Sequence, residues 1–292
     1  MKMRKGITLH NQLRDGFDAI TINSGTVFHK EQQTEEVNYQ GMRFTPLYEE
    51  FAYVTKRDWR PLKAQEIKTI QANGNRKDYN TVFVGDIPPH LRALFEELDL
   101  ANSKNRAEVL DKFGADPNKT MKVSQAMEEF LTPLANGKPF HFHCIGVNLP
   151  NIEMVACDTT RLPANFQEQD KRFMGIHNDG TQFMTLHTTY KFGNRISINL
   201  GKETRYFFFV NLTMIQALNM LKKKIDVKKH DVNIYNVPRH FFKHFPNYPV
   251  IKIRQEPYQY YIAPTDNCFH DGSTLGNSSL DVTIVYFGAF QC

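Results

Sequence analysis

The pattern of apolar and polar positions changes near residue 139. Before that point apolar residues recur at helical spacing over 89–100, 104–114 and 123–134, and Pro88-Pro89 is typical of the first turn of a helix. A short apolar run at 81–84 favours a strand. The polar segment 71–78 is rich in Asn and Gly and is expected to be a loop.

After residue 139 the pattern favours short strands with one helix among them. The predicted helix covers 213–225, with an apolar face that ends in a cluster of lysines. The predicted strands are 140–147, 153–156, 183–192, 195–200, 206–211, 250–254, 258–263 and 280–287. We therefore expect an α+β protein in which a helix-rich first part packs on an antiparallel β barrel or sandwich.

Composition narrows the class of protein. The 292 residues carry a formal charge of +5, from 36 Lys and Arg against 31 Asp and Glu, and no apolar run is long enough to span a membrane. This mild basic excess suits an anionic small substrate and does not favour a nucleic-acid partner. The lysines of 222–229 suit a solvated helix end, the alternative being a polyanion contact. Four cysteines without a C-x-x-C pair favour free thiols and a cytoplasmic location.

The segment 175–180 contains the strongest chemical signal in the sequence. It reads Gly-Ile-His-Asn-Asp-Gly, so His177 and Asp179 are two residues apart in extended backbone and point to the same side. His270 follows 93 residues after His177, next to another predicted strand. Two imidazoles and one carboxylate on one face of a metal ion form the facial triad of non-haem Fe(II) oxygenases. His141 and His143 could form a rival pair, but no third ligand is evident near them.

The order of His-x-Asp, strands, distal His and a final strand at 281–287 resembles the Fe(II)/2-oxoglutarate-dependent dioxygenases. This resemblance implies a double-stranded β-helix (jelly-roll) core over 140–292. The chain would then be a single catalytic domain, 1–292, with a mixed, helix-rich extension at 1–139 and one inserted helix. It also implies Fe(II) held by His177, Asp179 and His270, with 2-oxoglutarate and O₂ as cosubstrates.

One position departs from the family pattern. Many members carry Arg-x-Ser about ten residues after the distal His, and the Arg binds the far carboxylate of 2-oxoglutarate. Here the matching residues are Asp281-Val282-Thr283, and an Asp would repel that carboxylate. If another strand supplies the cation, Lys191 has the best spacing, fourteen residues after His177, on the same strand face as Thr185, His187 and Thr189. The other candidates are Arg195, Arg205 and Arg254.

The sequence thus predicts a non-haem iron oxygenase that hydroxylates, desaturates or cyclises a small, carrier-linked or peptide-linked substrate. Three alternatives stay open. The enzyme could use iron and O₂ without 2-oxoglutarate, the chain could be a non-catalytic jelly-roll binding module, or it could be a metal-dependent isomerase or hydrolase. The oligomeric state is not indicated.

Overall fold

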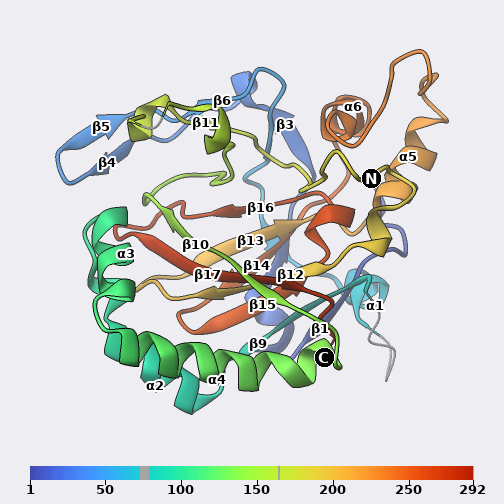
Figure 1. Cartoon of the computed structure of the whole chain (residues 1–292). Coiled ribbons are helices and arrows are strands. Elements are labelled where there is room, and N and C mark those ends of the chain that lie inside the picture. Colours follow the sequence, from blue (N-terminus) through green and yellow to red (C-terminus); the bar gives the residue numbers. More distant parts are fainter. Residues whose placement is uncertain (73–78, 164, 292) are drawn as a thin grey trace.

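Two large sheets form the centre of the computed structural model, which describes residues 1–72, 79–163 and 165–291 (Figure 1). The six-stranded sheet has the order β1-β9-β15-β12-β17-β10, and the five-stranded sheet has the order β16-β13-β14-β2-β8. Within these two sheets, neighbouring strands are antiparallel except β1 and β9, which pair in parallel. The six-stranded sheet contains β1 (Thr8–Asn11), β9 (Thr81–Asp86), β15 (Gln259–Ala263), β12 (Asn194–Asn199), β17 (Asp281–Gly288) and β10 (His141–Asn148). The five-stranded sheet contains β16 (His270–Ser273), β13 (Arg205–Phe209), β14 (Ile251–Gln255), β2 (Ile20–Ile22) and β8 (Arg60–Pro61).

Helices and short strand pairs surround these sheets. The short pairs are β3 (Thr26–Phe28) with β7 (Tyr53–Thr55), β4 (Val37–Tyr39) with β5 (Met42–Phe44), and β6 (Leu47–Tyr48) with β11 (Arg172–Phe173). The α-helices are α1 (Ala64–Ile70), α2 (Pro89–Leu98), α3 (Arg106–Gly114), α4 (Pro117–Ala135), α5 (Met214–Leu221) and α6 (Val237–His244). The 3₁₀ turns are η1 (Gly16–Ala19), η2 (His29–Glu31), η3 (Leu100–Asn102), η4 (Thr159–Arg161), η5 (Glu168–Asp170), η6 (Thr189–Lys191) and η7 (Thr265–Asn267).

The space between the two sheets is divided into an apolar half and a polar half. Alternate residues of β9 and β14 face inward, and Val82, Val84, Ile251 and Ile253 belong to one buried apolar cluster together with side chains of β1, β2 and β13. At β12 and β17 most inward positions are polar instead, as with Ser197 and Thr283, although Val285 also lines this space. The same alternation therefore builds a core at one side and a polar cavity at the other.

The outer face of the six-stranded sheet is covered by helices. Figure 1 shows α2 and α4 side by side along it, and Phe130 of α4 contacts the Tyr260 ring of β15 at 5.5 Å between centroids. Helix α4 begins where the Asp116 carboxylate accepts hydrogen bonds from two backbone amides, and Pro117 occupies its first turn. This helix is thus fixed by its own sequence at one end and by sheet packing along its length.

Most predicted strands and helices are confirmed, with ends that agree within about two residues. The exceptions among the helices are α4, which begins six residues earlier than predicted, and α5, which ends four residues earlier. The fold is a mixed one of helices and large sheets. Two predicted strands are wrong. Residues 183–192 form turns that end in η6, and residues 153–156 form no strand, although Val155 N donates to Gly272 O of β16. Two helices, α5 and α6, lie between β13 and β14 where one was predicted.

The first half of the chain supplies strands as well as helices. Strands β1 and β9 extend the six-stranded sheet, and β2 and β8 extend the five-stranded sheet. The segment 71–78, predicted as a loop, lies mostly outside the described residues. In the described part of the chain, no helix combines the length and hydropathy needed to cross a membrane.

Candidate metal centre

The His-x-Asp motif lies in extended backbone beside the five-stranded sheet. Its middle residue, Asn178, is buried and donates a hydrogen bond to the Ile234 carbonyl. His177 and Asp179 therefore share the opposite side of the segment. Gly175 precedes them at φ +70°, and a Cβ there would lie 2.4 Å from the Tyr53 carbonyl oxygen, so only glycine fits this approach.

A pair of backbone hydrogen bonds brings the distal histidine beside the motif. His177 N donates to His270 O at 3.1 Å, and His270 N donates to His177 O at 2.7 Å. This antiparallel bridge places the two imidazole centroids 4.5 Å apart. Strand β16 begins at His270 and pairs with β13, so a regular sheet holds the second imidazole in place.

Both imidazoles are oriented in the same way. Nδ1 of His177 lies 2.9 Å from the Gly175 carbonyl, and Nδ1 of His270 lies 3.3 Å from the Cys268 carbonyl. A carbonyl only accepts hydrogen bonds, so each contact requires a proton on Nδ1. In the neutral ring, Nε2 is then free to bind a metal ion.

The Asp179 carboxylate faces both free nitrogens. Its Oδ1 lies 3.4 Å from His177 Nε2, and its Oδ2 lies 3.4 Å from His270 Nε2. Adjacent ligands of an octahedral ion at roughly 2.1 Å would be about 3.0 Å apart, so a small contraction would suit an ion. In the described part of the chain these three residues are the one group whose ligand atoms all lie within 4.8 Å of one another.

Charge balance at the triad involves two further residues. Burial would raise the pKa of Asp179, but interactions with His270 and Arg195 hold this pKa well below its usual range. Burial also opposes protonation of His177, yet the Asp179 and Asp271 carboxylates outweigh it and raise its pKa to about 10. The metal-free site therefore favours a carboxylate facing a protonated imidazole.

The triad lies in the wall of a cavity of about 300 Å³ between the two sheets. This volume is at the lower end of the range for small-molecule sites. The cavity is lined by the triad, by Arg195, Ser197 and Thr283 of the six-stranded sheet, and by Arg205, Asp271 and Gly272 of the five-stranded sheet. His143 and Cys144 also line it, next to a β-bulge in β10.

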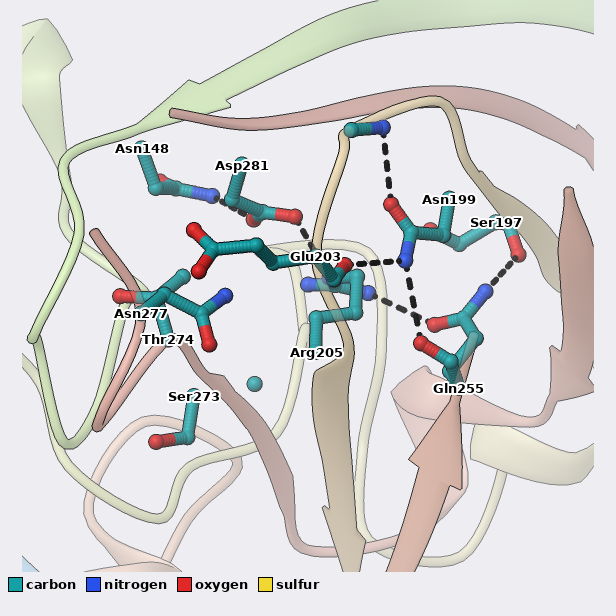
Figure 2. A network of polar contacts seen from close by, with 12 residues as sticks. Asn148, Ser197, Asn199, Glu203, Arg205, Gln255, Ser273, Thr274, Asn277 and Asp281 are labelled. Atoms are coloured by element: carbon teal, nitrogen blue, oxygen red, sulfur yellow. Dashed lines mark hydrogen bonds and ion pairs between the residues drawn. The ribbon is translucent and has the colours of Figure 1, made fainter. Parts of the chain in front are cut away.

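A buried ion pair joins the first residue of β13 to the first residue of β17 (Figure 2). Arg205 Nε lies 2.9 Å from Asp281 Oδ1, and both side chains are at most 5% exposed. Gln255 Oε1 accepts a hydrogen bond from Arg205 Nη1, and Asn148 donates one to Asp281 Oδ2. Asp281, which stands where the family pattern has Arg, is thus the ion-pair partner of an arginine on β13.

Gly272 makes room for the guanidinium group. A Cβ at this position would lie 2.8 Å from Arg205 Nη2 and 3.1 Å from Val155 Cγ2. Since Arg205 is held by Asp281 and Gln255, the group could not move aside freely. The absence of a side chain therefore keeps Nη2 beside the cavity.

Two of the predicted cations, Lys191 and Arg254, lie away from the cavity. Lys191 is exposed on η6, with its ammonium group 6.0 Å from the Tyr190 ring centroid. The strand that would have turned Lys191 toward the triad is absent, because 183–192 is held in turns by bonds such as Thr185 N to Thr188 Oγ1. Arg254 is 43% exposed and pairs with Asp15 at 2.6 Å and Glu256 at 3.1 Å. Neither residue lines the cavity of the triad.

Sequence reasoning missed the charged residues that surround the triad. Arg195 was a candidate only for binding 2-oxoglutarate, and the structure places its Nη1 3.2 Å from Asp179 Oδ2. Asp271 Oδ2 lies 3.7 Å from His177 Nδ1, and Asp266 pairs with Arg195. The position of Asp271 directly after His270 is the one sequence signal that could have indicated that Asp271 lies beside the triad.

Comparisons with known proteins give distant matches. No protein-family model matches the chain, and no curated protein matches it. Among solved structures, the chain is similar to the Kdo hydroxylase KdoO, a non-haem Fe(II) alphaketoglutarate-dependent dioxygenase solved with alphaketoglutarate and Fe(III). That match has 11% identity, a TM-score of 0.40, and coverage of 72% of this chain and 79% of the other. An N-substituted L-amino acid dioxygenase from Burkholderia ambifaria AMMD matches at 12% identity and a TM-score of 0.28, covering 70% and 80% of the two chains.

Proposed function

We propose that this protein is a non-haem Fe(II) oxygenase that uses 2-oxoglutarate and O₂ to oxidise a small, carrier-linked or peptide-linked substrate. The observation that carries the proposal is the convergence of His177, Asp179 and His270 in one cavity, with both Nε2 atoms directed at one carboxylate. Two neutral imidazoles and a carboxylate are the donors of the facial triad, and they suit Fe(II).

The strand order supports a double-stranded β-helix as the core. Along the chain, β10 and β12 belong to the six-stranded sheet, while the segment ending at His177 bridges to β16 in the other sheet. Strands β13 and β14 then pair in the second sheet, β15 returns to the first, β16 to the second and β17 to the first. This gives eight segments in two facing groups of four, as in a jelly roll. Strands from 1–139 extend both groups, which supports one domain over the whole chain.

Within this proposal Arg205 binds the distal carboxylate of 2-oxoglutarate. Its Nε and Nη1 contact Asp281 and Gln255, the guanidinium also contacts Tyr261, and Nη2 lies beside Gly272 at the cavity. A dicarboxylate that leaves water needs such a cation to recover its lost solvation. Tyr261 and Thr283 line the same cavity and offer hydroxyl groups for the same carboxylate.

Bound Fe(II) would supply the O₂ chemistry, and the protein would orient the reactants around it. Backbone carbonyls fix the two imidazoles through Nδ1, and the buried ion pair fixes Arg205. The sheets and the buried side chains behind them restrict access of water from the sides. The substrate would approach from the open part of the cavity near His143 and Cys144.

The second candidate is an iron oxygenase that does not use 2-oxoglutarate. The observation that favours it is the pairing of Arg205 with Asp281, because this carboxylate already neutralises the cation. The two candidates differ in one measurable property, which is whether 2-oxoglutarate binds the iron-loaded protein in the absence of other substrates.

The test is an anaerobic titration of 2-oxoglutarate into the Fe(II)-loaded protein, followed by the charge-transfer band of the chelate. Arg205→Met should weaken 2-oxoglutarate binding about 30- to 1000-fold, since a carboxylate left unpaired costs about 2–4 kcal/mol. Asp281→Asn should bind at least as tightly as wild type, because it removes a competing carboxylate. Lys191→Met and Arg254→Met are matched controls, and both should behave as wild type.

Three results would count against parts of the proposal. If wild type gives no band but consumes O₂ with a substrate, the 2-oxoglutarate proposal fails and the iron oxygenase remains. If wild type binds no iron, the oxygenase proposal fails as a whole. If Arg205→Met fails to fold because Asp281 is left unpaired, the double variant Arg205→Met/Asp281→Asn replaces it, and normal 2-oxoglutarate binding there would exclude Arg205 as the partner.

A further inference from the structure

Arg195 of β12 contacts the triad carboxylate that also faces the two imidazoles. Its Nη1 lies 3.2 Å from Asp179 Oδ2 and 2.7 Å from Asp266 Oδ1, and it also donates to Thr265 Oγ1. The guanidinium group lies against the Phe287 ring, 5.2 Å from its centroid. The side chain is only 16% exposed. Arg195 is therefore fixed by partners on several elements and does not extend freely into solvent.

Asp266 holds this arginine in place. It belongs to η7, between β15 and β16, and its side chain is fully buried. Its Oδ1 accepts from Arg195 Nη1, while Oδ2 has no hydrogen-bond partner among the described residues. A buried carboxylate with one cationic partner keeps that partner close, because separation would leave a buried charge unpaired. Asp266 thus keeps the Arg195 guanidinium beside Asp179.

We infer that Arg195 is a positioning residue that limits Asp179 to one metal-binding oxygen. The inference rests on the proposed function. A carboxylate can bind a cation through one oxygen or through both. Arg195 binds Oδ2, which leaves Oδ1 as the oxygen with the fewer competing partners. Single-oxygen binding matters because three protein ligands leave three octahedral positions, of which 2-oxoglutarate takes two and O₂ needs the third.

If Arg195 has this role, its removal should change Fe(II) affinity and access to the third open position in opposite directions. Arg195 repels a metal ion through its charge, so its loss should leave Fe(II) binding as tight as in wild type or tighter. Its loss should also free Asp179 to bind through both oxygens, which closes the third open position. A purely structural role for Arg195 predicts that metal binding and access to the third position are lost together.

The experiment uses the full-length protein under anaerobic conditions, loaded with Fe(II) and 2-oxoglutarate. Fe(II) affinity is measured by competition with a coloured chelator, and access to the open position is measured by electron paramagnetic resonance of the nitric oxide adduct. In Arg195→Met, nitric oxide affinity should fall about tenfold or more, with Fe(II) affinity equal to or above wild type. Arg195→Lys keeps the charge and should recover nitric oxide binding. Arg57→Met removes an arginine paired with Glu35 and Glu153, away from the triad, and should change neither value.

The outcomes are distinguishable. If Arg195→Met loses Fe(II) affinity and nitric oxide binding in parallel while Arg57→Met does not, the inference is overturned and the proposed function stands. If Arg195→Met binds nitric oxide as wild type does, the inference is also overturned. Should Arg195→Met fail to fold, Arg195→Gln gives the same test with a side chain that can still hydrogen-bond Asp266. Failure of wild type to bind Fe(II) would reject the proposed function instead.

Discussion

His177 must lose a proton before it can bind a metal ion. Its pKa is raised to about 10 in the metal-free protein, because the carboxylates of Asp179 and Asp271 outweigh the effect of burial. At neutral pH the imidazole is then protonated, and each bound ion releases that proton. The residues that make a good metal site therefore also make its affinity depend on pH.

This linkage gives a prediction with a definite sign. Below the raised pKa, the fraction of His177 that is deprotonated rises tenfold with each unit of pH. The affinity for Co(II) should therefore rise about tenfold per unit from pH 6 to pH 8. In Asp271→Asn the pKa of His177 should fall, and the slope should become shallower over the same range. Calorimetric titration in several buffers measures both the affinity and the proton release. If Co(II) affinity in wild type does not change with pH, metal binding displaces no proton from His177.

Gly272 gives a second prediction at the level of a single residue. A methyl group there would press on Arg205 Nη2 and Val155, so Gly272→Ala should weaken 2-oxoglutarate binding about tenfold or more without loss of Fe(II). The matched control is Gly114→Ala, where nothing lies within 4 Å of the added Cβ. Equal 2-oxoglutarate affinity in wild type and Gly272→Ala would argue against Arg205 as its partner.

Among the elements, alternation of side chains predicted most strands correctly and was misleading over 183–192. Strands such as β12 and β17 alternate between the helix-covered core and the cavity, and their positions could be predicted. The segment 183–192 also alternates, with Thr185, Thr189 and Lys191 on one predicted face, yet threonine hydroxyls there bond to nearby backbone and favour turns. Lys191 was assigned to the site through that strand and lies outside it for the same reason.

Helix α5 allows a prediction about local stability. Its apolar residues Leu218 and Leu221 are buried, whereas the turns over 222–229 are lined with exposed lysines. Amide hydrogen exchange should therefore be slow at 218–221 and markedly faster at 222–229. Rapid exchange over the whole of 214–229 would show that α5 is not packed as a stable helix.

At the scale of the molecule, the two halves of the chain share both sheets. The sequence indicated the triad because His-x-Asp and the distal His are close to strands whose order resembles a known family. It could not indicate that β1 pairs in parallel with β9, or that Arg195 and Asp266 meet at Asp179. Those contacts depend on long-range pairing, which leaves no local pattern in the sequence.

The metal should stabilise the whole fold, because its proposed ligands join two segments 93 residues apart. A ligand at 100 times its dissociation constant adds about 2.7 kcal/mol to the free energy of unfolding. For a chain of this size we expect a rise in Tm of about 4–5 °C with Mn(II). His270→Ala should abolish the rise, and Arg57→Met should retain it even if its baseline Tm is lower. Differential scanning fluorimetry with and without chelator measures both.

An anaerobic crystal structure with Mn(II) and 2-oxoglutarate would show whether this cavity is the active site. We expect one ion at roughly 2.0–2.3 Å from His177 Nε2, His270 Nε2 and an Asp179 oxygen. We also expect 2-oxoglutarate bound to that ion, with its distal carboxylate on Arg205. An ion bound elsewhere, or a triad that stays metal-free at saturating Mn(II), would contradict the assignment of this cavity as the active site of an iron oxygenase.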